Sequence, residues 1–183
     1  MQVAAGPGLT VPVLETERLR LRGHRADDFG ASCAMWSDPA VIKHTTGMPQ
    51  PGEEVWKRLL RYGGLWSMLG YGYWAVEDKA TGEFVGEVGF ADFKREMTPS
   101  LDGMPEIGWV LASHTHGKGL ATEAVKAALA WGDQHFGTVM TCCIIHPENT
   151  ASIRVADKCG YREWQRAKYK EHDVIVYRRD AAN

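Results

Sequence analysis

The segment from Ile107 to Phe136 constrains the fold more than any other part of the chain. It begins with an apolar strand, Ile107–Leu111, and continues through a glycine-containing turn into residues with the apolar spacing of a helix, Leu120–Phe136. A strand that leads through a turn into an amphipathic helix is typical of domains in which helices cover a sheet. The chain is therefore expected to form a mixed α/β domain.

The start of this helix is also a candidate anion site. Its first backbone N–H groups lack intrahelical partners, and Gly117 and Gly119 let a ligand approach the backbone closely. The turn does not continue as a phosphate-binding P-loop, because Gly117-Lys118 is followed by Gly119-Leu120 and not by Ser or Thr. It also lacks the third small residue of a dinucleotide-binding fingerprint. A phosphate site and a merely tight turn both remain open from this segment alone.

The remaining periodicity predicts one α/β domain: a single mixed, mostly antiparallel sheet flanked by helices. We expect this domain at residues 14–183 and an N-terminal tail at residues 1–13. Gly63-Gly64 is expected to weaken or bend the second helix. The expected elements are a strand at 18–22, helices at 27–36 and 53–69, strands at 71–76, 84–90 and 107–111, a helix at 120–136, a strand at 139–145, a helix at 150–159 and two strands within 163–178.

Charge and hydropathy exclude several classes of function. The 183 residues contain 21 Lys and Arg against 23 Asp and Glu, a net charge of -2, whereas nucleic-acid-binding proteins usually carry a basic excess. No apolar run approaches the roughly 18 residues of a membrane span, and the N-terminus lacks the pattern of a signal peptide. We therefore expect a cytoplasmic protein, a monomer or homodimer, with neither a nucleic-acid nor a membrane partner.

The cysteines and histidines predict no metal site. The four cysteines form no Cys-x-x-Cys pair, so reduced structural thiols are expected. His114 and His116 form a His-x-His pair, but no cluster of further ligands stands near them in the sequence.

Two ordered motifs resemble the GNAT acetyltransferase superfamily. The segment from His116 to Ala121 resembles that family's acyl-CoA pyrophosphate loop, Gln/Arg-x-x-Gly-x-Gly/Ala, and its continuation Ala121-Thr122-Glu123-Ala124 is similar to the RimJ/RimL-type branch. Downstream, Asn149-Thr150-Ala151-Ser152 and the following Lys-x-Gly-Tyr, residues 158–161, resemble that branch's Asn-x-x-Ser helix. Residues 15–22 look like its opening strand. The matches span residues 14–178.

The resemblance implies a binding site for acetyl-CoA. Backbone amides from Gly117 to Thr122 would hold the pyrophosphate, and the strand Trp109–Leu111 would pair with the pantetheine arm. Asn149 would bind that arm, cap the helix from Thr150, or do both. The cofactor-binding residues implied are Trp109, Val110, Leu111, His116, Gly117, Lys118, Gly119, Leu120, Ala121, Thr122 and Asn149.

Three positions depart from the family's pattern. The first loop residue is His116 rather than Gln or Arg. Ala156 stands where many relatives have a tyrosine that protonates the leaving thiolate. Residues 144–146 are Ile-Ile-His, where some relatives keep a catalytic glutamate.

The catalytic candidates are therefore less determined than the cofactor loop. Glu106, at the start of the central strand, is our candidate base; its alternative role is a solvated strand-end carboxylate. Glu87 on the neighbouring strand is a reserve base, and His146 is either another base or part of a strand end. Ser152 is a candidate for the catalytic group that hydrogen-bonds the thiol sulfur, as an acid or to orient it.

The expected activity is transfer of an acetyl group from acetyl-CoA to a primary amine, on a protein N-terminus or a small molecule, by direct attack in a ternary complex. A base near the acceptor removes the ammonium proton. One alternative is a non-catalytic acyl-CoA-binding module, since the tyrosine is missing at Ala156. A nucleotide-binding oxidoreductase is a further alternative.

Overall fold

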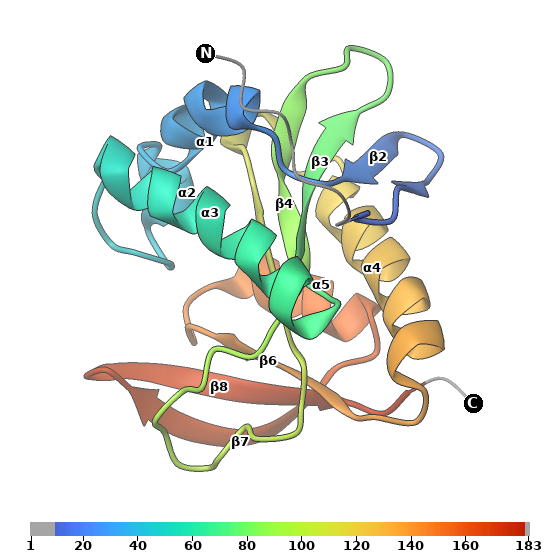
Figure 1. Cartoon of the computed structure of the whole chain (residues 1–183). Coiled ribbons are helices and arrows are strands. Elements are labelled where there is room, and N and C mark those ends of the chain that lie inside the picture. The colour runs from blue at the N-terminus through green and yellow to red at the C-terminus, as the bar shows by residue number, and fades with distance from the viewer. Residues whose placement is uncertain (1–9, 182–183) are drawn as a thin grey trace.

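Eight strands form one sheet in the order β1-β2-β3-β4-β5-β6-β8-β7 (Figure 1). The structure is a computed structural model and describes residues 10–181. All neighbouring strands are antiparallel except β5 and β6, which are parallel. The predicted mixed, mostly antiparallel sheet is therefore confirmed. The strands are β1 (Leu14–Glu15), β2 (Leu19–Arg22), β3 (Tyr73–Asp78), β4 (Phe84–Ala91), β5 (Glu106–Leu111), β6 (Thr141–Ile145), β7 (Arg162–Tyr169) and β8 (His172–Arg179).

Helices cover both faces of this sheet. On β3, Tyr73 stacks on Tyr62 with ring centroids 4.6 Å apart, whereas its neighbour Trp74 packs edge-to-face on Trp131 at 5.1 Å. Successive strand residues point to opposite faces, so the helices that carry Tyr62 and Trp131 lie on opposite sides. The helical elements are η1 (Ala26–Asp28), α1 (Phe29–Met35), α2 (Pro39–Ile42), α3 (Gly52–Leu69), η2 (Ser113–Thr115), α4 (Leu120–Phe136) and α5 (Thr150–Lys158).

One helical element differs from the sequence prediction. The helix α2 begins at Pro39, where the prediction placed only a helix end. Asp38 caps α2 by accepting a hydrogen bond from the backbone N–H of Ala40 at 2.8 Å, and proline suits the first helical position. The helix α3 runs through Gly63-Gly64 without interruption, so these glycines do not end it; that they weaken it stays a prediction.

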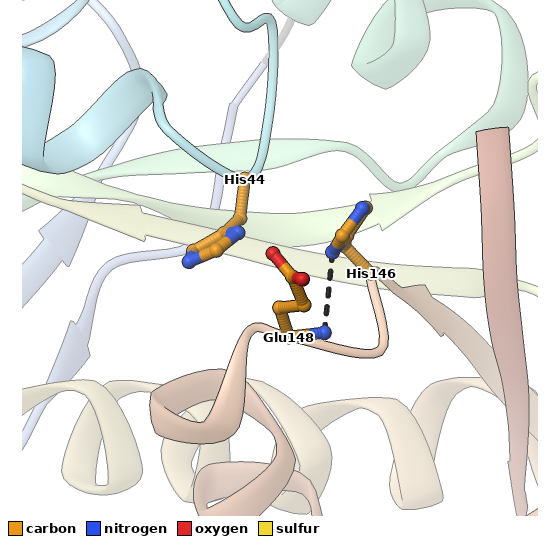
Figure 2. Close-up of side chains that lie close together, drawn as sticks. All are labelled: His44, His146 and Glu148. Carbon is orange, nitrogen blue, oxygen red and sulfur yellow. Dashed lines mark hydrogen bonds between the residues drawn. The ribbon is translucent and has the colours of Figure 1, made fainter.

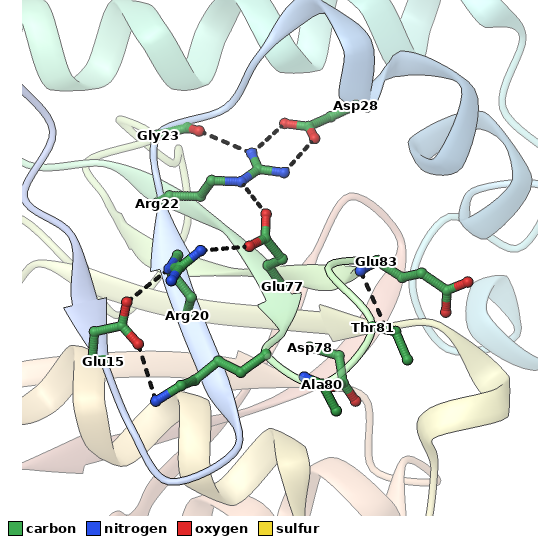
Figure 3. A network of polar contacts seen from close by, with 11 residues as sticks. Glu15, Arg20, Arg22, Gly23, Asp28, Glu77, Asp78, Ala80, Thr81 and Glu83 are labelled. Atoms are coloured by element: carbon green, nitrogen blue, oxygen red, sulfur yellow. Dashed lines mark hydrogen bonds and ion pairs between the residues drawn. The ribbon is translucent and has the colours of Figure 1, made fainter.

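An ion-pair network joins the first strands to the helical layer (Figure 3). Arg22 is 6% exposed and donates to both carboxylate oxygens of Asp28, at 2.9 and 2.8 Å, and to Glu77 at 2.8 Å. Arg20 bridges Glu77 and Glu15 on the outer side. Although arginines alternate with leucines along β2, Arg22 is buried, because two carboxylates neutralise and hydrogen-bond it.

The central strands β5 and β6 pair only where β5 begins. Their register contains one residue pair, Glu106 with Cys142, whereas β4 and β5 pair over six positions. The β5 residues Trp109–Leu111 therefore have a strand partner on the β4 side and none on the β6 side. This divergence leaves one edge of β5 without a strand partner at its carboxyl end, just before η2 and the turn into α4.

The described part of the predicted N-terminal tail is docked on the domain. Trp74 Nε1 donates to the carbonyl oxygen of Pro12 at 2.8 Å, and Val11 packs against the main core. Residues 1–9 of that tail lie outside the described residues.

Candidate active site

A pocket of about 420 Å³ opens where β5 and β6 diverge. Its walls come from the end of β5, the turn before α4, the first turns of α4 and α5, and the segment that includes α2. Most of the predicted site residues line it, so the fold brings together segments from residues 109 to 152. Those residues are Trp109, Val110, Leu111, His116, Gly117, Gly119, Leu120, Ala121, Thr122, Asn149 and Ser152.

The turn before α4 has the geometry of an anion site. Gly117 and Gly119 both adopt the left-handed conformation, with φ of 76° and 79°, which costs other residues about 1–2 kcal/mol. Gly119 is the N-cap of α4, and the first helical hydrogen bond in this turn runs from Glu123 N to Gly119 O. The N–H groups of the preceding residues in the first turn lack intrahelical partners and lie at the positive end of the helix dipole.

His116 ties this turn back to the strand. Its Nε2 lies 2.9 Å from the carbonyl oxygen of Leu111, and an N–H at that nitrogen donates to the carbonyl. The contact spans five residues, so it closes the turn at the pocket mouth. His116 thus has a structural partner, at the loop position where the acyl-CoA motif that this segment resembles has Gln or Arg.

Lys118 does not line the pocket, and its backbone contacts Arg18, the residue just before β2. The carbonyl oxygen of Lys118 accepts from Arg18 Nη1 at 2.9 Å. Arg18 also pairs with Glu123 in the first turn of α4, and Thr16 Oγ1 donates to the same carboxylate at 2.7 Å. Arg18 thereby neutralises Glu123, an acidic group that would otherwise repel an anion bound at the helix start.

The beginning of α5 forms the opposite wall. Asn149 Oδ1 accepts from the backbone N–H of Ser152 at 3.1 Å, which confirms its predicted N-cap role. Ser152 is half-buried and lines the pocket. Ala156, one turn further, is fully buried in the main core, so that position offers no proton donor. Arg154 and Lys158, which the prediction did not include, add two cationic side chains to this wall.

The wall from the α2 segment was missed by the sequence analysis. Ala40, Val41, His44 and Thr45 line the pocket. Their position depends on Asp38, which caps α2 and also accepts a short hydrogen bond from Ser113 Oγ in the turn after β5. The signal that could have found this wall is the pair Asp38-Pro39, a favoured start of a helix.

Glu106 lies apart from the pocket. Its carboxylate forms a two-fold ion pair with Arg95, at 2.6 and 2.8 Å, and it is 6% exposed. The Arg95 guanidinium also lies over the rings of Phe93 and Tyr169. The alternative of a solvated strand-end carboxylate is therefore wrong. The base role stays a prediction, with a structural role in competition.

The reserve base, Glu87, is enclosed on the α3 side of the sheet. It is 1% exposed and accepts a short hydrogen bond from the Tyr62 hydroxyl. Burial raises the pKa of Glu87. Its β4 position pairs in register with Val110, a pocket residue, although Glu87 itself does not line the pocket.

Comparison with known proteins places this geometry in a family. Residues 18–162 match the family described as an acetyltransferase (GNAT) domain. The chain belongs to the GNAT acetyltransferases. An acetyltransferase assigned to the GNAT family from Bordetella pertussis has the same fold, with a TM-score of 0.81, 29% identity, and coverage of 92% of this chain and 99% of that one. The assignment makes the alternative of a nucleotide-binding oxidoreductase wrong.

Relatives in sequence cover nearly the whole GNAT chain. The uncharacterized protein YkkB of Bacillus subtilis is 33% identical over 181 residues, 93% of this chain and 96% of its own. The uncharacterized N-acetyltransferase p20 of Bacillus licheniformis is 29% identical over 171 residues, covering 90% and 93%.

The RimL fold is shared as well. A RimL structure, an acetyltransferase of ribosomal L7/L12, in complex with coenzyme A has a TM-score of 0.73 at 18% identity, with coverage of 92% and 98%. Within the described residues, no helix has the length and apolarity needed to cross a membrane.

Proposed function

We propose that this GNAT acetyltransferase moves an acetyl group from acetyl-CoA to a primary amine, on a protein N-terminus or a small molecule. The observation that carries the proposal is the coincidence of three features in one pocket: the unpaired edge of β5, the glycine turn, and the start of α4. An elongated acyl carrier with a pyrophosphate needs all three. The similarly folded RimL has been solved in complex with coenzyme A, which supports an acyl-CoA carrier as the ligand.

Each part of the carrier has a counterpart in the pocket. The pyrophosphate fits the N–H groups of the α4 start, and the pantetheine amides fit, as an added strand, the edge of Trp109–Leu111 that has no strand partner. Arg154 and Lys158 supply positive charge near the phosphates. Because backbone groups provide most of the anion site, the chain needs no basic excess, in agreement with its net charge of -2.

The transfer itself requires positioning and two proton movements. The neutral amine attacks the thioester carbonyl, a C–N bond forms, the C–S bond breaks, and the thiolate takes up the proton that the attacking nitrogen gives up. N–H groups at the unpartnered end of β5 would polarise the carbonyl oxygen, and Ser152, which lines the pocket, is proposed to hydrogen-bond the sulfur. Much of the rate would come from holding donor and acceptor together. Glu106 remains the predicted acceptor of the ammonium proton.

The cofactor proposal is tested by acetyl-CoA titration in a calorimeter, followed by acetyl-CoA consumption over a panel of amines and N-terminal peptides. Gly119→Glu places a carboxylate at the anion site and is expected to abolish binding. Gly103→Glu is the matched control, because Gly103 has the same φ of 79° with open space around it and does not line the pocket. Equal binding by both variants would contradict the proposal.

A further inference from the structure

Two histidines and a glutamate converge at the edge of the pocket. His44 follows α2, whereas His146 and Glu148 lie in the connection between β6 and α5. The nitrogen and oxygen atoms that these side chains offer lie within 4.8 Å of one another. Figure 2 shows the carboxylate of Glu148 between the two imidazole rings.

The backbone holds this arrangement in place. The N–H of Asn149 donates to the carbonyl of His146 at 2.9 Å, which closes a turn that brings His146 and Glu148 to the same side. The N–H of Glu148 donates to His146 Nδ1 at 3.2 Å and orients the ring (Figure 2). The His44 ring stacks on the His146 ring with centroids 5.4 Å apart and an interplanar angle of 29°.

The donor set is that of a transition-metal site. Two imidazoles and one carboxylate, with a fourth position open, are ligands that Zn²⁺ and its neighbours accept, whereas Mg²⁺ and Ca²⁺ prefer oxygen alone. Ligand atoms around tetrahedral Zn²⁺ are about 3.4 Å apart for bonds near 2.1 Å. The cluster must therefore contract, and the exposed side chain of Glu148 and the half-buried histidines have room to turn.

We propose that His44, His146 and Glu148 bind a divalent first-row transition metal such as Zn²⁺. The ion takes the place of the hydrogen bond at His146 Nδ1 and joins the α2 segment to the β6–α5 connection. His44 lines the pocket, and so does Asn149, the neighbour of Glu148. The metal thus tethers two walls of the pocket. The positive charge of Lys43, beside His44, repels a bound cation, and the negative charge of Glu148 offsets this repulsion.

Metal binding is tested without acetyl-CoA, so its outcome is independent of the proposed function. The full chain, free of added histidines and treated with a chelator, is titrated with Zn²⁺ by calorimetry and with Co²⁺ by visible absorption. We expect one equivalent to bind, with nitrogen and oxygen ligation in the Co²⁺ spectrum, and the melting temperature to rise. His44→Ala and His146→Ala are each expected to weaken binding about 10-fold or more.

Controls separate this cluster from other ligands. His172→Ala removes an exposed histidine on β8, and Cys33→Ser removes the one cysteine of intermediate exposure; both should leave the affinity unchanged. Glu148→Gln keeps the shape of the side chain and should weaken binding if the carboxylate is a ligand. Absence of saturable binding, thiolate ligation of Co²⁺, or unchanged affinity in both histidine variants would overturn the proposal.

Discussion

Replacing Glu106 by glutamine distinguishes a structural carboxylate from a catalytic base. The substitution keeps the size of the side chain and removes its charge, which leaves the largely covered guanidinium of Arg95, whose side chain is 17% exposed, without a counter-ion. Removal of one partner from a buried ion pair typically costs 3–5 kcal/mol. The retained amide oxygen and the rings of Phe93 and Tyr169, 4.8 and 4.6 Å from the guanidinium, offset part of this cost.

We therefore expect Glu106→Gln to lower the free energy of unfolding by about 3 kcal/mol. For a chain of this length, that loss lowers the melting temperature by about 6–12 °C. Urea unfolding followed by tryptophan fluorescence measures the first quantity and calorimetry the second. The double variant Glu106→Gln, Arg95→Met should be more stable than Glu106→Gln alone, because it leaves no unpaired buried charge.

Enzyme kinetics complete the test. If Glu106 is structural, turnover below the melting transition falls by a similar factor at every pH. The structural role would be refuted, and the base role supported, by a Glu106→Gln protein with two properties. Its free energy of unfolding would lie within about 0.5 kcal/mol of the parent's, and its turnover would fall mainly at low pH.

Three further predictions concern the cap, a buried histidine and a packed glycine. Asn149→Ala should destabilise by about 1 kcal/mol and weaken acetyl-CoA binding in calorimetry, whereas Asn149→Asp keeps the cap and should preserve stability. Burial lowers the pKa of His24 to about 4, and neither ring nitrogen has a hydrogen-bond partner. In the unfolded chain His24 takes up a proton near its ordinary pKa of about 6.5, so the free energy of unfolding falls as the pH drops from about 6.5 to 4. Urea unfolding of the parent at these two pH values should show this loss, and His24→Phe should make it smaller by about 3 kcal/mol. Gly132→Ala places a Cβ 2.9 Å from the Phe90 ring and should lower the free energy of unfolding by about 1 kcal/mol. Gly64→Ala lies in open space on α3 and should raise it by a similar amount. Equal shifts of the urea midpoint in the two variants would contradict the packing argument.

The cofactor loop and its helix were predictable from the sequence because their determinants are local. The apolar spacing that predicted Leu120–Phe136 reproduces the bounds of α4. Gly117 and Gly119 sit where positive φ is needed, and Asn149 caps α5 through a contact three residues away. Such contacts form within one turn of chain, so residue type and spacing suffice to predict them.

Tertiary structure decided the environment of each ionisable group. Glu106 resembles an exposed strand-end carboxylate until the loop that carries Arg95 folds over it. The glycine loop is completed by Arg18, about 100 residues earlier in the chain. His44 and His146 come together because α2 and the end of β6 meet at one edge of the pocket. The pairing of distant segments depends on the packing of the whole sheet, and burial and charge partners follow from that packing. The sequence by itself therefore determined the glycine turn and helix start at which we propose that an acyl carrier binds, and only the tertiary structure decided which side chains are free to act on it.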